Sequence, residues 1–189
     1  MKTLFSTLVA IAAFSFLAFT APIDILTVDA TASQLTWKGY KVTGSHEGTI
    51  SVKEGQLLME DGQLTGGSFV IDINSMTCTD LQGGMADKLL GHLKSDDFFG
   101  AEAHPEAKFV ITKVASRGTE GAYKVYGDLT IKGTTKEVRF NTQLSEESGS
   151  MIAVADLEID RTDYGLKYGS GSFIDNLGDK TIYDEFELG

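Results

Sequence analysis

The segment 123–144 decides the fold, and it reads YKVYGDLTIKGTTKEVRFNTQL. Before Gly133, apolar side chains hold one parity and polar side chains most of the other, and the same period of two resumes after this glycine. This alternation predicts a β-hairpin with one apolar and one polar face. The apolar positions are Val125, Leu129, Ile131, Val138, Phe140 and Leu144. Because an isolated hairpin is marginal in water, its apolar face requires further strands.

Segments with a similar pattern lie on both sides of this hairpin. We expect strands at 34–42, 49–53, 56–59, 68–73, 107–114, 150–160 and 180–188. The segment 44–48 has a glycine at each end and predicts the turn between the first two of these strands. Consecutive antiparallel strands in this number close into a barrel or form a sandwich, so the fold class is all-β.

Residues 80–94 break the period of two. Met85, Leu89, Leu90 and Leu93 recur at helical spacing, which predicts one amphipathic helix that ends before Ser95. We expect its leucines to make ordinary core contacts with the sheet. The segment 166–179, which contains Gly169, Gly171 and Gly178, predicts a mobile rim or lid.

Composition limits the class of protein. The chain of 189 residues has 21 Gly, 2 Pro and a formal net charge of -11. Such a length suits one domain, which we place at 22–189, and frequent glycine favours short strands with tight turns. The acidic balance argues against nucleic acid or an anionic membrane surface as partners, because both are held chiefly by Lys and Arg.

The N-terminal segment 1–21 has a different residue pattern from the strands. Lys2 precedes an apolar run from Leu4 to Phe19, and small residues follow that run. This order is typical of a cleaved secretory signal, after whose removal no stable membrane insertion is expected. A retained membrane anchor is the alternative, although the run is shorter than a spanning helix requires.

Residues with catalytic or metal-binding chemistry are few. The only histidines are His46, His92 and His104, none of them in a metal-binding motif, and Cys78 is the only cysteine. We therefore predict no enzyme activity, no cofactor and no metal. The alternative is an enzyme or metal site that brings His46, Arg161 and Asp163 together in the folded chain.

Several motifs, taken in order, resemble those of one family. They are Trp37, Gly44-x-His46-x-Gly48, Leu93-x-Ser95-x-x-Phe98-Phe99, Pro105-x-Ala107-x-Phe109, residues 127–133 (GDLTIKG) and Arg161-x-Asp163-Tyr164-Gly165. The chain resembles the YceI-like, lipocalin-like polyisoprenoid-binding proteins. The resemblance implies an extended, antiparallel, eight-stranded barrel whose apolar lumen holds a long isoprenoid chain. It also implies a secreted or periplasmic bacterial protein.

Strand parity identifies the residues that face such a lumen. The inward set is Leu35, Trp37, Phe69, Ile71, Phe109, Ile111, Val125, Leu129, Ile131, Val138, Phe140, Leu144, Leu157 and Ile159. Each of them is either simple core or a ligand contact. Gly127 interrupts the apolar parity, and its missing side chain would widen the lumen or relieve curvature.

Polar residues at a mouth would position a head group. The candidates by motif are His46, Arg161, Asp163 and Tyr164. For Arg161, an ion pair with Asp163 or another carboxylate that fixes a turn is the alternative role.

These observations lead to a functional prediction. The sequence predicts a secreted or periplasmic, non-enzymatic binder or carrier of an isoprenoid-type lipid, either polyprenyl or quinone-like. The alternative is a barrel with a filled lumen that acts as an envelope-stress or protein-interaction module. A homodimer is compatible with either reading.

Overall fold

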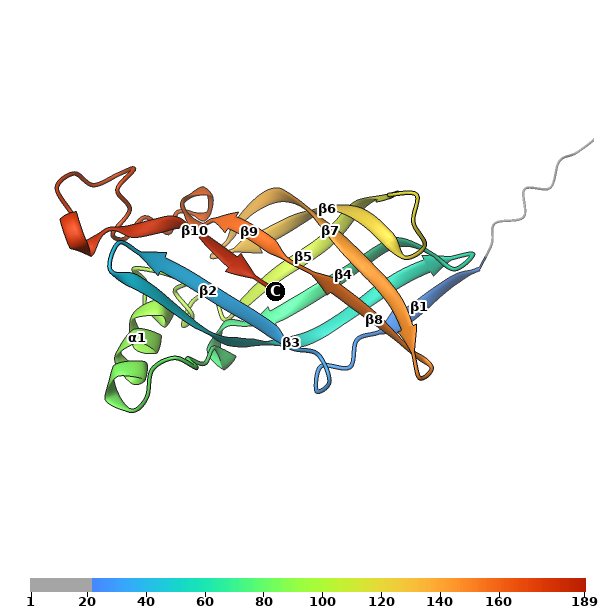
Figure 1. Cartoon of the computed structure of the whole chain (residues 1–189), viewed down its shortest axis with the longest axis horizontal. Helices are drawn as coiled ribbons and strands as arrows, with labels where there is room; N and C mark the ends of the chain where they lie inside the picture. The colour runs from blue at the N-terminus through green and yellow to red at the C-terminus, as the bar shows by residue number, and fades with distance from the viewer. Residues whose placement is uncertain (1–21) are drawn as a thin grey trace, which may run out of the picture.

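The computed structural model describes residues 22–189, so the predicted signal segment 1–21 lies outside the described residues. Strands dominate the described chain (Figure 1). They are β1 (Ile23–Thr27), β2 (Leu35–Lys41), β3 (Gly44–Glu60), β4 (Gln63–Asp72), β5 (Glu106–Ser116), β6 (Ala122–Ile131), β7 (Thr134–Glu147), β8 (Ser150–Ala155), β9 (Leu157–Asp160) and β10 (Ile182–Leu188). The α-helix is α1 (Gly84–Lys94), and the 3-10 helices are η1 (Ile73–Ser75), η2 (Arg161–Tyr164) and η3 (Gly178–Lys180).

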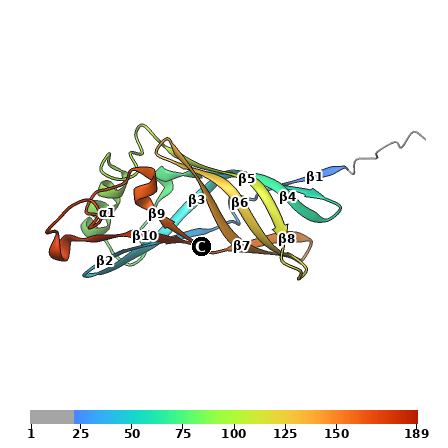
Figure 2. The same ribbon diagram turned by 90° about the horizontal axis from the view of Figure 1, so that it is seen from above.

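The strands form one antiparallel sheet that curls into a nearly closed barrel (Figures 1 and 2). The order across the sheet is β8-β7-β6-β5-β4-β3-β2-β10-β9, and β1 pairs with β3 beside this path. Only Asp156 separates β8 from β9, so one extended segment touches both ends of the sheet. Counted as one strand, that segment gives eight strands in the wall, and the all-β barrel prediction is confirmed.

The predicted turn at 44–48 is wrong, because these residues belong to β3. The chain turns at Val42 and Thr43 instead, and β3 then runs beside β2 with Gly48 opposite Trp37. A Cβ on Gly48 would collide with the carbonyl of Thr77 and with Trp37 Nε1. This glycine therefore serves close approach within a strand, and the turn needs no glycine at that position.

Strand boundaries differ from the predictions at two other places. The predicted strands 49–53 and 56–59 are parts of β3, whose pairing with β4 shifts register between Val52 and Glu54. The predicted strand 150–160 is interrupted, since Ala155 pairs with Thr142 of β7 and Leu157 pairs with Leu188 of β10. In both cases the predicted alternation of apolar and polar residues is right. The strand boundaries differ because of a register shift in β3 and a change of pairing partner after β8.

Helix α1 is shorter than predicted, and it lies at one end of the barrel. The segment between β9 and β10 lies at the same end, whereas β1 lies at the opposite end (Figures 1 and 2). Leu89, Leu90 and Leu93 pack, partly buried, against the core, as expected for an amphipathic stripe. Met85 is 68% exposed and takes no part in this contact.

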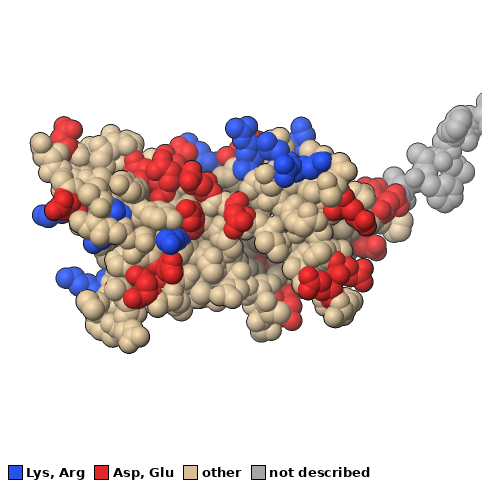
Figure 3. Space-filling view, in the orientation of Figure 1, with Lys and Arg blue, Asp and Glu red and all other residues tan. Residues whose placement is uncertain are grey.

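The chain carries 27 Asp and Glu residues against 16 Lys and Arg. Asp and Glu side chains are spread over the face seen in Figure 3, whereas a dense group of Lys and Arg side chains lies along one edge. Lys113 and Lys124 place their Nζ atoms 5.4 Å and 5.8 Å from the centroid of the Tyr126 ring. Among residues 22–189, no helix has the length and apolar character that crossing a membrane requires.

Candidate functional site

A cavity of about 420 Å³ lies at the end of the barrel that carries α1. Strands β2, β3, β4, β5, β6 and β10 contribute to its wall, together with α1 and the segments around Phe98 and Leu166. Most of the wall is apolar, and its members include Trp37, Ile50, Ile71, Leu129, Ile131 and Phe186. A largely apolar concavity of this volume has the size of a small-molecule site.

The single tryptophan contributes an apolar face to this wall. Trp37 is buried, and its Nε1 donates to the carbonyl of Thr77 at 3.0 Å. Since its polar atom is already hydrogen-bonded within the protein, the rest of the indole is free to serve as an apolar surface.

Polar residues gather where the tip of β2 meets β10. Lys41, His46, Asp179, Lys180 and Glu185 all line the cavity. These side chains place both signs of charge around the apolar space, and they could contact the polar end of a guest.

His46 is held by a carboxylate outside the cavity. His46 Nδ1 lies 2.8 Å from Asp80 Oδ2, and Asp80 Oδ1 accepts from the backbone N–H of Glu47 at 3.0 Å. The thiol of Cys78 donates to the same oxygen at 3.2 Å. Burial alone would raise the pKa of Asp80, but these hydrogen bonds together lower it to about 2. Asp80 is therefore ionised at neutral pH and fixes the His46 ring.

Aromatic rings join α1 to the segment after η2. The rings of His92 and Tyr168 meet edge-on with centroids 4.5 Å apart, and His92 also meets Phe98 at 5.1 Å. All three residues line the cavity. This contact gives the segment 166–179 a fixed attachment, and Leu166 and Ser170 are fully buried within it. We call the segment 166–179 the rim. It is attached to α1 at this point, and its mobility stays a prediction.

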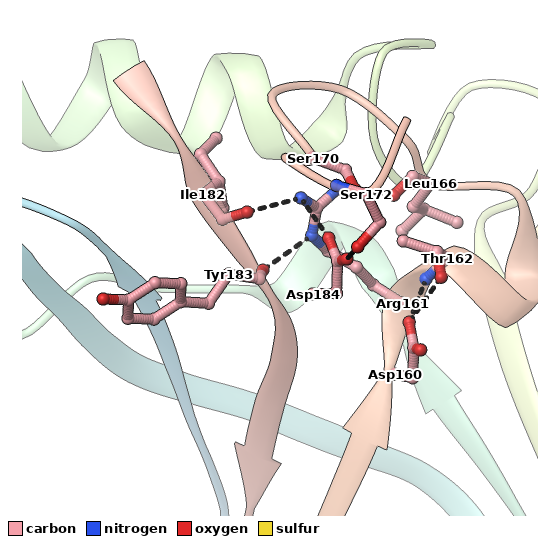
Figure 4. Close-up of polar contacts among 9 residues, drawn as sticks. All are labelled: Asp160, Arg161, Thr162, Leu166, Ser170, Ser172, Ile182, Tyr183 and Asp184. Atoms are coloured by element: carbon pink, nitrogen blue, oxygen red, sulfur yellow. Dashed lines mark hydrogen bonds and ion pairs between the residues drawn. The ribbon is translucent and has the colours of Figure 1, made fainter. Parts of the chain in front are cut away.

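Arg161 is a buried clamp, as Figure 4 shows. Its Nε donates to the carbonyl of Tyr183 at 3.0 Å, and Nη2 donates to the carbonyl of Ile182 at 3.1 Å and to Asp184 Oδ1 at 3.3 Å. Its Nη1 donates to the carbonyl of Leu166. The guanidinium therefore ties η2 and the rim to β10.

The carboxylate partner of Arg161 is Asp184, which also accepts from the hydroxyl of Ser172 at 2.6 Å (Figure 4). Burial would raise the pKa of Asp184, but the serine hydrogen bonds and the charge of Arg161 outweigh it and lower that pKa. An ion pair between Arg161 and Asp163 is absent from the described ion pairs, because Asp163 points toward Lys136, 3.8 Å away at the surface. The alternative prediction for Arg161, an ion pair with a carboxylate, is therefore confirmed with Asp184 as the partner.

The four predicted head-group residues do not converge. His46 and Arg161 line the cavity, whereas Asp163 and Tyr164 do not. Tyr164 is buried, and its hydroxyl has no hydrogen-bond partner within the described chain. Burial, with Asp163 beside it, raises the pKa of Tyr164 to about 12.

All fourteen apolar lumen candidates lie in or against the hydrophobic core. Only Trp37, Ile71, Leu129 and Ile131 of this set line the cavity. The others are core residues or are partly buried against the core, and they are Leu35, Phe69, Phe109, Ile111, Val125, Val138, Phe140, Leu144, Leu157 and Ile159. Whether any of the fourteen contacts a ligand stays a prediction.

Gly127 does not widen the lumen. A Cβ at this position would collide with the ring of Phe109 and lie 2.6 Å from the carbonyl oxygen of Val110. The ring of a residue on β5 has therefore taken the place that the missing side chain leaves on β6. The expectation of a wider lumen is wrong, since strand parity does not reveal what a neighbouring strand places over a glycine.

Several lining residues escaped the parity argument because they lie outside the strands. Leu89, His92 and Leu93 come from α1, and Phe98 and Phe99 follow it. In the sequence, the leucine stripe predicts ordinary core contacts, and Phe98-Phe99 belongs to a family motif. Gly39 shares the parity of Trp37 and lines the cavity, but a glycine gives no apolar signal in a strand pattern.

A wider depression of about 690 Å³ is lined by residues of β2, β3, β9 and β10, among them Trp37 and Leu188, which also line the first cavity. Its carboxylates are Glu47, Asp156, Glu158 and Glu187. Glu47 pairs with Lys38 at 3.1 Å, and Glu187 accepts from the hydroxyl of Tyr40 at 2.8 Å.

Across residues 22–189, no group of three or more His, Cys, Asp or Glu residues is arranged to hold a metal ion. Burial raises the pKa of the Cys78 thiol, which therefore stays protonated at neutral pH.

Solved structures share the fold. BcnA of Burkholderia cenocepacia superposes with a TM-score of 0.68 at 23% identity, covering 85% of this chain and 95% of that one. A YceI protein of Campylobacter jejuni superposes with a TM-score of 0.51 at 20% identity, covering 66% of this chain and 68% of that one.

Sequence relatives give the family. A UPF0312 protein of Shewanella denitrificans is 31% identical over 130 residues, which are 66% of this chain and 65% of that protein. A UPF0312 protein of Photorhabdus laumondii is 48% identical over 56 residues, 30% of this chain and 28% of that protein. The matched segments thus span under two thirds of these relatives' lengths. The model of the YceI-like domain matches residues 26–189, and the chain belongs to the YceI-like family.

Proposed function

We propose that the protein is a secreted or periplasmic, non-enzymatic binder or carrier of an isoprenoid-type lipid. The observation that carries this proposal is the apolar cavity of about 420 Å³ inside one end of the barrel. Its one deeply buried charge, Arg161, is committed to backbone carbonyls and to Asp184. An apolar chain can therefore enter without leaving a buried charge unpaired.

Area burial supplies the binding free energy. Each 100 Å² of apolar surface removed from water contributes about 2.5 kcal/mol, and immobilising the chain offsets part of this gain. Polyprenyl and quinone-like lipids share the tail that the cavity would hold. The polar residues that line the cavity, Lys41 and His46 among them, would meet the head group of either.

The first test is the extraction of lipid from protein purified without detergent, followed by mass spectrometry. Farnesol and a quinone with a short prenyl tail would then be titrated into the delipidated protein. Trp37, the only tryptophan, lines the cavity and gives a fluorescence signal for binding. Protein that is reproducibly empty and that takes up neither lipid would refute the proposal.

A pair of glycine variants makes the titration specific. A Cβ on Gly39 would meet no atom within 4 Å, and this residue lines the cavity, so Gly39→Leu should fill the space. We expect it to weaken farnesol binding at least about tenfold, which is the effect of losing ~1.4 kcal/mol. Gly91 on α1 is equally unobstructed but does not line the cavity, so Gly91→Leu is the matched control. Equal binding by both variants would place the lipid elsewhere.

A further inference from the structure

The inner end of the cavity coincides with a change in the residues that pair across β4 and β5. Ile71 pairs with Ala107, and both line the cavity. Two residues farther along each strand, Phe69 pairs with Phe109, and neither residue lines it. The open space therefore stops where two phenylalanines replace an isoleucine and an alanine.

These two rings belong to a layer of three. The ring centroids of Phe69 and Phe109 are 6.4 Å apart with an interplanar angle of 28°, and those of Phe109 and Phe140 are 5.4 Å apart at 47°. We call Phe69, Phe109 and Phe140 the aromatic layer. It draws one ring from each of β4, β5 and β7, which lie within four consecutive strands of the wall.

Glycines on neighbouring strands seat two of these rings against backbone. The ring of Phe109 takes the space beside Gly127 on β6, and a Cβ on Gly55 of β3 would lie 2.8 Å from Phe69 Cδ1. The rings of Phe69 and Phe109 therefore have little room to shift toward these two neighbouring strands.

Most side chains beyond the aromatic layer are buried, although Ile111, two residues beyond Phe109 on β5, is only partly buried. Val125 is 1% exposed, and Leu57, Leu64 and Leu144 are also buried. None of these residues lines the cavity. A guest chain that reaches the aromatic layer therefore meets a region whose side chains are mostly buried and which the cavity does not include.

We propose that the aromatic layer limits the length of chain that the barrel accepts, an inference that rests on the proposed function. At ~30 Å³ for each water-sized group, a cavity of about 420 Å³ holds about 14 such groups, or roughly three isoprene units. The guest is either a short prenyl compound or a long one whose remaining units stay outside the barrel.

Titration with prenyl alcohols of two, three, four and eight isoprene units tests the limit in the wild-type protein. We expect the dissociation constant to fall from two units to three and then to change by less than about threefold. A barrel that admitted the whole chain would instead gain about tenfold or more with every further buried unit.

Variants of Phe109 then test whether the aromatic layer is the stop. Phe109→Ala should let binding strengthen up to four units or beyond, and Phe109→Leu, which disturbs packing less, should do so to a smaller extent. Leu144→Ala, which opens space beyond the layer and away from the cavity, is the matched control and should keep the wild-type plateau.

The outcomes separate the two proposals. Failure of every prenyl alcohol to bind would overturn the proposed function, and the length limit with it. Binding that strengthens steadily to eight units in the wild type would overturn the length limit alone. A wild-type plateau that persists in both Phe109 variants would also overturn it, because another feature would then set the stop.

Discussion

Arg161 Nη2 and Asp184 Oδ1 lie 3.3 Å apart, and their side chains are only 5% and 14% exposed. Arg161→Ala would leave Asp184 buried without its cation and three backbone carbonyls without their donor. We expect the free energy of unfolding in denaturant to fall by about 3–5 kcal/mol. Lys136→Ala, which removes the exposed pair with Asp163, is the control and should cost ~1 kcal/mol or less. Equal losses would show that the buried pair of Arg161 and Asp184 contributes no more to stability than the exposed pair of Lys136 and Asp163.

Asp80 should make stability depend on acid pH. Its pKa is about 2 in the folded protein against 3.8 for the free side chain. A lowered pKa stabilises the folded state above the unfolded value, and this contribution is lost as pH falls from about 4 to about 2. Asp80→Asn should therefore be less stable at pH 7 and should lose less stability over that interval. Denaturant titrations at several pH values measure both, and parallel curves would contradict the assignment.

The hydroxyl of Tyr164, which has no hydrogen-bond partner within residues 22–189, should cost stability. A buried polar group without a hydrogen bond is unfavourable by about 1–3 kcal/mol, so Tyr164→Phe should raise the free energy of unfolding by about 1 kcal/mol. Because its pKa is raised to about 12, the wild type should also lose stability between pH 10 and 12, where the unfolded chain ionises first. The variant should lack that part of the loss. A destabilised variant would mean that the hydroxyl has a partner.

Tyr168 should control how quickly a guest leaves. Its ring contacts His92 and Phe98 at the cavity rim, yet the residue is 46% exposed, so Tyr168→Ala should change stability little. We expect faster dissociation of farnesol in stopped-flow measurements of Trp37 fluorescence. Phe173→Ala in the same segment is the control, since Phe173 lies against Lys167, 4.2 Å from its ring centroid, and does not line the cavity. Equal rates for the two variants would argue against a gate at Tyr168.

Gly127 should tolerate no side chain. Gly127→Ala must displace the ring of Phe109 or the β5 backbone, and we expect a loss of about 1–3 kcal/mol in unfolding free energy. Gly39→Ala, a substitution in another paired strand where a Cβ meets no atom within 4 Å, should be nearly neutral. Similar losses for both would show that the contact with Phe109 does not determine the cost of a side chain at position 127.

Alternation along the chain was enough to predict most of the barrel, because each strand has one face toward the core. It could not reveal β1, whose Ile23 and Ile25 are exposed and carry no buried parity. Nor could it locate the end of β8, since Ala153, Ala155 and Leu157 keep one parity while the segment changes partner at Asp156.

The cavity was harder to predict than the wall. Parity identifies which side chains point inward, but whether they enclose space depends on their volumes across several strands. Ile71 with Ala107 leaves room, whereas Phe69 with Phe109 does not, and this comparison requires the register between β4 and β5. The partner of Arg161 likewise lies 23 residues away on β10, beyond the reach of a local motif.

The break at Asp156 gives the barrel wall a seam. Within residues 22–189, β8 is bonded only to β7 and β9 only to β10, whereas a strand such as β6 is bonded on both sides. Backbone amides along the seam are held by one ladder, so they should exchange with deuterium before those of β6. The barrel wall would then open between its two end strands, β8 and β9, while β4, β5 and β7, which carry the aromatic layer, stay hydrogen-bonded to their neighbours.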